Sequence, residues 1–285
     1  MVKMDYVWDR TTEFLGDHLS AVLPLAVIGI LVPTSIMNAL TPLWTEAGHG
    51  LGLMLMAVTI VAVVVLLWAY LAITALVVDS AARPRVAGIA ARRLLPLIGI
   101  YLLLAAVFAV LFLPIGQLAA MSGMNLAAMQ AGQPIKVTSP TMMWSLVLYS
   151  LAFTALLVLV MARLAPLGAV IVAERRGIGA IAQAWRLTRG MTLPLIGVAI
   201  LYFVVSQVAG LAARTVFGSI LRFVSPGDGP ITVANIVTTI VVSAVSTVFT
   251  VLSTVFTAKL YVEVMRSIES VPAPVLTADS DATLP

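Results

Sequence analysis

The chain has 285 residues, of which 61% are hydrophobic and only 10% charged, and its formal net charge is +4. A soluble domain is about 25% charged, so this chain has too few polar groups to cover a globule in water, and we expect it to reside in lipid. The absence of cysteine excludes disulfides, thiolate chemistry and cysteine-based metal sites. In a membrane protein, the excess of basic over acidic residues indicates loops that face anionic lipid headgroups, and we expect no nucleic-acid partner.

Six apolar stretches are long enough to cross a bilayer as α-helices. A span needs about 20 mostly apolar residues, because the hydrocarbon core is about 30 Å thick and a helix rises 1.5 Å per residue. Apolar runs of this length also lack the alternation of a membrane β-barrel. The sequence therefore predicts an all-α polytopic transmembrane bundle in residues 1–266, with spans near Leu19–Leu40, Leu53–Val78, Leu95–Leu113, Met143–Val172, Leu193–Leu211 and Ile231–Val262.

Lysine and arginine are distributed unequally between the two sides of the expected bundle. The chain has 16 of them, and with Arg163 set aside as intramembrane the opposite side holds three: Lys136, Arg214 and Arg222. The other side holds twelve: Lys3, Arg10, Arg83, Arg85, Arg92, Arg93, Arg175, Arg176, Arg186, Arg189, Lys259 and Arg266. Because cytoplasmic loops carry the excess of lysine and arginine, we expect both termini in the cytoplasm. Residues 267–285 have no periodicity and are expected to form a disordered cytoplasmic tail.

The tripeptide Leu-Pro-Leu occurs three times, each time where a span is expected to begin. It stands at residues 23–25, 95–97 and 193–195, and a short stretch with apolar residues at helical spacing precedes each copy. Proline is tolerated in the first turn of a helix, and an apolar face opposite arginine is typical of a helix in the interface plane. The pattern predicts three repeated hairpins, each preceded by a cytoplasmic interfacial amphipathic helix; chance recurrence in a leucine-rich chain is the alternative. The candidate contacts of these helices with anionic lipid are Arg92, Arg93, Trp185, Arg186 and Arg189.

Residues 163–190 carry a more specific pattern. Arg163, a proline-containing apolar stretch with Pro166, and Glu174 are followed by an amphipathic helix that ends in Trp-Arg-Leu-Thr-Arg-Gly at residues 185–190. The segment resembles the membrane domain found N-terminal to some bacterial glycerophosphoryl diester phosphodiesterases, which also occurs as a stand-alone multi-pass protein. The resemblance extends over residues 5–266 and is specific only within 163–190. It implies a bacterial inner-membrane location and supplies no settled activity.

Catalytic motifs are absent from the sequence. The phosphodiesterase domain of that family needs paired histidines, several carboxylates and a divalent metal, whereas this chain has only His18 and His49, expected on opposite membrane faces. Neither a P-loop nor Gly-x-Ser-x-Gly nor Gly-x-Gly-x-x-Gly occurs. We therefore expect no catalytic, cofactor-binding or metal-binding residues and no enzyme activity.

Arg163 is the sharpest local feature, because it stands within the fourth apolar stretch. An arginine buried in a membrane costs several kcal/mol and needs a partner. Structural pairing with Glu174 or Glu263, the carboxylates on that side, is the favoured interpretation. In a second interpretation the span ends near Arg163, whose side chain reaches the headgroups, and Pro166 starts a surface segment. In a third, Arg163 belongs to a transport or lipid-headgroup site.

The last span carries a stripe of hydroxyl residues. Spacings of 4, 3, 4, 3 and 4 residues place the members on one helix face: Thr239, Ser243, Ser246, Thr250, Ser253 and Thr257. The favoured interpretation is a packing seam, since small hydroxyl residues allow close helix approach and hydrogen bonds between helices. The alternative is a polar lumen for a substrate.

Together these features predict a non-enzymatic integral membrane protein that acts in lipid or envelope organisation or as a membrane scaffold, with membrane lipids as its partners. The alternative is a transporter or lipid-translocating permease that uses the polar face of the last span and Arg163. A membrane-embedded enzyme is the weakest reading, because the spans contain no cluster of carboxylates or histidines.

Overall fold

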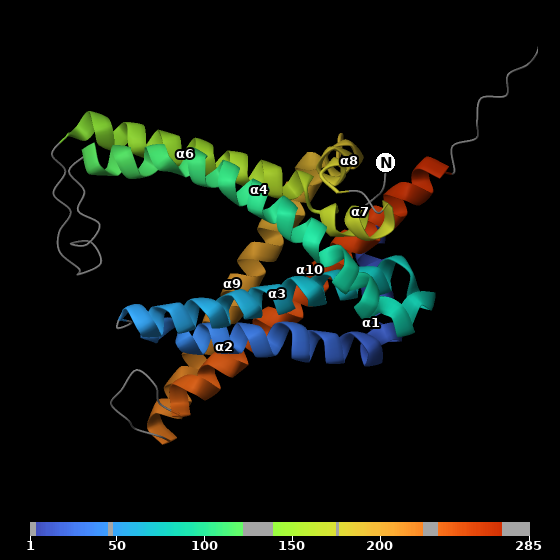
Figure 1. Ribbon diagram of the computed structural model, residues 1–285, viewed down its shortest axis with the longest axis horizontal. Helices are drawn as coiled ribbons and strands as arrows, with labels where there is room; N and C mark the ends of the chain where they lie inside the picture. Colours follow the sequence, from blue (N-terminus) through green and yellow to red (C-terminus); the bar gives the residue numbers. More distant parts are fainter. Residues whose placement is uncertain (1–3, 45–47, 122–138, 175–176, 225–232, 270–285) are drawn as a thin grey trace, which may run out of the picture.

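The computed structural model describes residues 4–44, 48–121, 139–174, 177–224 and 233–269, and the regular structure in these residues is helical (Figure 1). One π-helix, η1, and two short 3₁₀-helices, η2 and η3, accompany the α-helices. In chain order the elements are α1 (Met4–Ala26), η1 (Val27–Leu31), α2 (Val32–Leu40), η2 (Thr41–Trp44), α3 (His49–Val78), η3 (Ser80–Arg85), α4 (Val86–Met121), α6 (Pro140–Arg163), α7 (Leu167–Glu174), α8 (Gly179–Leu187), α9 (Thr192–Val224) and α10 (Val233–Glu269).

Six helical segments are long and apolar enough to cross a membrane, which confirms the predicted all-α polytopic architecture. They are Met4–Trp44, His49–Val78, Arg83–Met121, Pro140–Glu174, Thr192–Ile220 and Asn235–Glu269. Many large apolar side chains on these segments are exposed, such as Leu53 at 70% and Leu148 at 69%. Because lipid is as apolar as leucine, such side chains are at home facing a bilayer.

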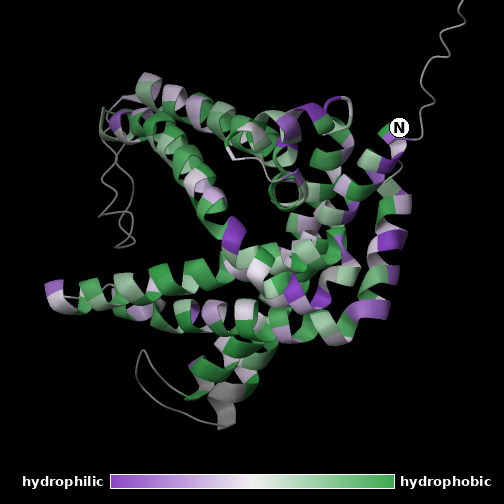
Figure 2. Cartoon of the chain, turned by 45° about the vertical axis from the view of Figure 1, so that its right-hand side comes forward, coloured by the Kyte–Doolittle hydropathy of each residue, from purple (hydrophilic) through white to green (hydrophobic). Residues whose placement is uncertain are grey.

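The core is concentrated at one end of the molecule. The α4–α6 and α2–α3 pairs both extend to the left in Figure 1 and diverge, while the start of α1, η3, α7 and α8 gather on the right, where the long helices meet. Accordingly, residues 71–77 of α3 are all buried, whereas most of its first two turns is exposed. Hydrophilic residues also gather at this end, and the extended helices are mainly hydrophobic (Figure 2). The first described residues of α1, the last described residues of α10, η3 and α8 thus belong to one end of the molecule.

The predicted interfacial helices before the first two spans are wrong as separate elements. Residues 4–26 form one α-helix through Pro24, and residues 86–121 form one through Pro96. Proline removes one backbone donor without ending a helix when the surrounding turns remain bonded and packed. Only the third lead-in is a separate helix, α8, and it connects to α9 through a turn in which Gly190 has φ 93°. That left-handed conformation favours glycine, and neither of the first two copies has a glycine within four residues before Leu-Pro-Leu.

The three Leu-Pro-Leu copies nevertheless share an orientation. The first leucine of each copy is exposed: Leu23 at 54%, Leu95 at 80% and Leu193 at 83%. The second leucine points inward, since Leu97 and Leu195 are buried and Leu25 is partly buried against the core. Equivalent packing at three positions supports a structural repeat of the hairpins.

The fourth span is interrupted, in contrast to the continuous helix expected over residues 143–172. α6 ends at Arg163, a turn occupies residues 164–166, and α7 starts at Leu167. Pro166 explains the break, because it has no N–H for the carbonyl of Ala162 and disfavours helical geometry in the residue before it. α7 is no surface segment: its residues 167–171 are all buried.

The first span is irregular as well. In η1 the N–H of Val32 donates to the carbonyl of Val27, one residue further back than in an α-helix. The widened turn directly precedes Pro33, whose missing N–H and ring disfavour the normal ladder. Gly29 of η1 lies so close to α3 that a Cβ there would overlap the Cβ of Ala69. This close approach is what the glycine permits.

Candidate functional site

Arg163 lies at the junction of α6 with α8. Its guanidinium carbon is 5.1 Å from the centroid of the Trp185 ring, and its Nη1 donates a long 3.4 Å hydrogen bond to the Trp185 carbonyl. The hydroxyl of Thr188, which is buried, donates to the Arg163 carbonyl at 3.1 Å. Arg163 therefore secures the end of α6 to the last turn of α8 by a cation–π contact and backbone hydrogen bonds.

The two carboxylates expected to pair with Arg163 have other partners. Glu174, at the end of α7, accepts 3.3 Å hydrogen bonds from Gln183 Nε2 and from the Tyr261 hydroxyl. Glu263, only 8% exposed, pairs with Arg266 at 3.0 Å. Within the described residues, neither carboxylate forms a salt bridge with Arg163. The favoured pairing is thus wrong, and the helix end at Arg163 agrees with the first half of the second interpretation.

α8 presents an apolar surface beside basic residues. Its buried face consists of small residues, Ala180 and Ala184, which let it pack closely on α7. Its outward face carries a shallow hollow lined by Ile178, Ile181, Ala182, Trp185 and Arg186. Trp185 is 39% exposed and Ile178 is 72% exposed. An exposed tryptophan and isoleucine next to arginine are typical of a helix lying in a lipid interface.

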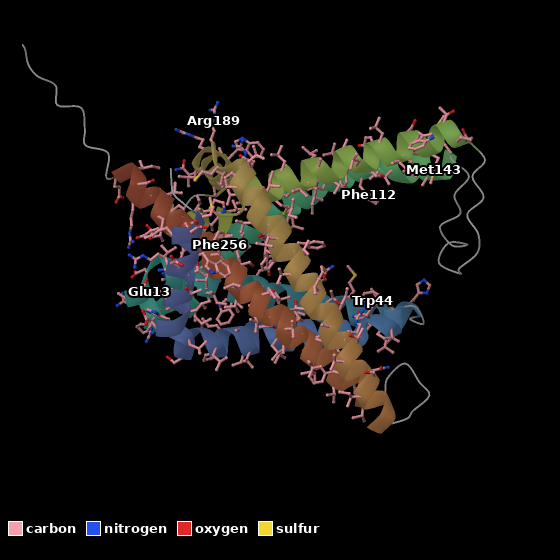
Figure 3. The ribbon with its side chains drawn as sticks, turned by 180° about the vertical axis from the view of Figure 1, so that it is seen from behind. Glu13, Trp44, Phe112, Met143, Arg189 and Phe256 are labelled. Atoms are coloured by element: carbon pink, nitrogen blue, oxygen red, sulfur yellow. The ribbon has the colours of Figure 1, made fainter. Side chains whose placement is uncertain are left out.

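Further predicted basic contacts lie next to α8 and on α4. Arg186 is exposed, and Arg189 is directed away from the body of the molecule in Figure 3. On α4, Arg92 is exposed and Arg93 is partly buried. Four of the five predicted lipid contacts are therefore exposed: Arg92, Trp185, Arg186 and Arg189.

The hydroxyl residues predicted on α10 do not line one continuous surface. Ser246 is exposed, while Thr239 and Thr250 are partly buried. The other three face three different helices: Ser243 accepts a 3.2 Å hydrogen bond from Asn38 of α2, Ser253 lies near Tyr202 of α9, and Thr257 lies near Tyr70 of α3. This distribution agrees with a packing seam shared by several helices and gives no support to a lumen along the stripe.

The sequence reading missed Tyr70, which holds the interrupted fourth span in place. Its hydroxyl lies between Gly168 of α7 and Thr257 of α10. Gly168 is in the first turn of α7, where N–H groups have no partner within the helix. A Cβ on Gly168 would lie 2.5 Å from the Tyr70 hydroxyl, so the glycine is required for this contact. The proline break at residue 166 was the available signal, since a new helix start needs a cap.

Across the part of the chain that the structure describes, no three His, Asp or Glu residues are placed to hold a metal ion together.

Comparison of the chain with known protein families, with curated proteins and with solved structures finds no match. The resemblance of residues 163–190 to a bacterial membrane-domain family therefore stays a prediction.

Proposed function

We propose that the chain is a non-enzymatic protein of a bacterial inner membrane that organises lipid by binding anionic headgroups at the cytoplasmic face. The observation that carries this proposal is the outward face of α8, on which Ile178 and Trp185 are exposed beside Arg186. The resemblance of this segment to the membrane-domain family supports the same location. A role as a scaffold follows if bound lipid or the basic end recruits a protein partner.

Lipid binding by purified full-length protein tests the proposal. Each basic residue near an anionic surface contributes about 1 kcal/mol, so the pair Arg186→Gln and Arg189→Gln removes about 2 kcal/mol, or a factor of about 30 in affinity. The measurement is native mass spectrometry in detergent with added phosphatidylglycerol. Arg214→Gln is the matched control, because Arg214 is exposed and expected on the opposite side. Equal losses in the α8 variant and the control would contradict the proposal.

A transporter is the second candidate, and the interruptions of two spans favour it. Discontinuous spans often surround transporter binding sites, and here η1 and the α6–α7 break both contact the same turn of α3, at Ala69 and Tyr70. Single-cysteine variants at Ser243 and Ser253 discriminate between the two functions. Labelling by a water-soluble thiol reagent indicates an aqueous path along α10, whereas unreactive cysteines indicate a packed seam.

A further inference from the structure

A small charged pocket lies between α1, the end of α3 and α10, at the end of the molecule that Glu13 marks in Figure 3. Its volume is about 330 Å³. Six of its lining residues are charged: Arg10, Glu13, Asp17, Lys259, Glu263 and Arg266. It shares no lining residue with the α8 face, so it is a separate candidate site.

Four of these charges pair along their own helices. Arg10 Nη1 contacts Glu13 Oε2 at 2.7 Å on α1, and Arg266 Nη1 contacts Glu263 Oε1 at 3.0 Å on α10. Each guanidinium keeps further N–H groups, since arginine has five donors. The two pairs are therefore neutral in sum and still offer hydrogen-bond donors to the pocket.

The remaining two charges, Lys259 and Asp17, form no salt bridge with each other. The Lys259 ammonium nitrogen lies 4.6 Å from the centroid of the Phe14 ring. That contact attracts the charge but leaves the three N–H donors of the ammonium group without an oxygen acceptor. Within the described residues, Lys259 and Asp17 have no partner of opposite charge within 4.0 Å. The pocket thus offers one unpaired cation and one unpaired carboxylate.

We propose that this pocket binds a zwitterionic phosphate ester with a primary ammonium group, of the phosphoethanolamine type. The phosphate group contacts Lys259 and the free N–H groups of Arg266, because arginine and lysine donors suit phosphate oxygens. The ammonium group of the ligand contacts Asp17. The volume is at the low end for ligand sites, which suits a headgroup. The ester is either the headgroup of a diacyl lipid or its soluble deacylated form.

The test uses full-length protein in detergent that carries Arg186→Gln and Arg189→Gln, so that the α8 face does not add its own affinity for anionic lipid. It measures the affinity of this parent protein for phosphatidylethanolamine and for phosphatidylglycerol, which lacks the amine. The expected result is a preference for phosphatidylethanolamine. Losing one charge-assisted hydrogen bond weakens binding about tenfold or more. Asp17→Asn is expected to weaken phosphatidylethanolamine by that factor and to leave phosphatidylglycerol unchanged, which abolishes the preference. Lys259→Gln is expected to weaken both lipids.

Matched controls remove a charge of the same sign outside the pocket: Asp9→Asn on α1 and Arg85→Gln on η3, both exposed. They are expected to keep the preference of the parent protein. Thermal unfolding of each variant shows whether it is folded. If Lys259→Gln does not fold, the Asp17→Asn variant tests the proposal by itself, because Asp17 is exposed and its replacement leaves the core intact. A preference that survives in Asp17→Asn, or equal affinities in the parent protein with the two α8 substitutions, would overturn the proposal.

Competition with glycerophosphoethanolamine distinguishes the two sources of the ligand. Displacement of phosphatidylethanolamine by this soluble ester supports recognition of the headgroup alone. Retention of the lipid, together with the Asp17-dependent preference, supports a site that takes the diacyl form. The α8 proposal depends on anionic charge and on Arg186 and Arg189, so either proposal can fail while the other stands.

Discussion

The hydroxyl group of Tyr70 joins three segments that are distant in the sequence, α3, α7 and α10. Tyr70→Phe removes the hydroxyl group that lies against Gly168 and Thr257, so the free energy of unfolding is expected to fall by about 1 kcal/mol. Denaturation in one detergent at one pH measures the change. Tyr101→Phe is the control, since Tyr101 is 37% exposed and its replacement is expected to cost less than about 0.5 kcal/mol. Equal effects of both variants would show that the Tyr70 hydroxyl does not hold α7.

The cation–π contact of Arg163 with Trp185 is a second interaction between individual residues. Arg163→Ala is expected to lower the free energy of unfolding by about 0.5–2 kcal/mol, the range of a cation–π contact. A double-mutant cycle with Trp185→Ala is expected to show coupling, whereas cycles with Glu174→Gln and Glu263→Gln are expected to be additive. Coupling to either carboxylate, and none to Trp185, would restore the ion pair that the sequence favoured.

At the scale of helices, the close contact between η1 and α3 leaves no room for a larger side chain at Gly29. Gly29→Ala places a Cβ on the Cβ of Ala69, and overpacking of this kind typically costs about 1–3 kcal/mol. The melting temperature of the full-length protein is therefore expected to fall. Ala69→Gly in the same chain removes the opposing Cβ and is expected to restore part of the loss. A Gly29→Ala protein that melts at the wild-type temperature would mean that the two helices lie further apart.

Helix existence could be read from the sequence better than helix continuity. Apolar length alone predicted the six spans, because a bilayer imposes that length on every helix. The Leu-Pro-Leu pattern placed three helix starts, yet Pro24 and Pro96 lie inside helices and only the copy after Gly190 begins one. Whether a proline ends a helix depends on the packing of the turns around it, which a single sequence does not specify.

For the whole molecule, the contacts between helices were the feature least predictable from the sequence. Arg163 and Glu174 are close in the sequence, which favoured an ion pair between them. That Arg163 contacts Trp185 and not Glu174 depends on how α8 folds back. Two exposed acids near the N-terminus, Glu13 and Asp17, line a pocket with Lys259, which lies more than 240 residues later in the chain. The location of the charged end was predictable, since positive residues mark one side of a membrane protein.

Topology in intact cells tests most directly whether the basic end faces the cytoplasm, on which the proposed lipid function depends. The chain has no cysteine, so single-cysteine variants carry no background. Ser80 and Gly177 represent the basic end, while Gly50 and Thr141 represent the other end, and all four are exposed. With the outer membrane permeabilised, a membrane-impermeant maleimide is expected to label Gly50→Cys and Thr141→Cys, and to label Ser80→Cys and Gly177→Cys only after the inner membrane is opened. Labelling of Ser80→Cys or Gly177→Cys in sealed cells would contradict the proposed orientation and, with it, cytoplasmic lipid binding by α8.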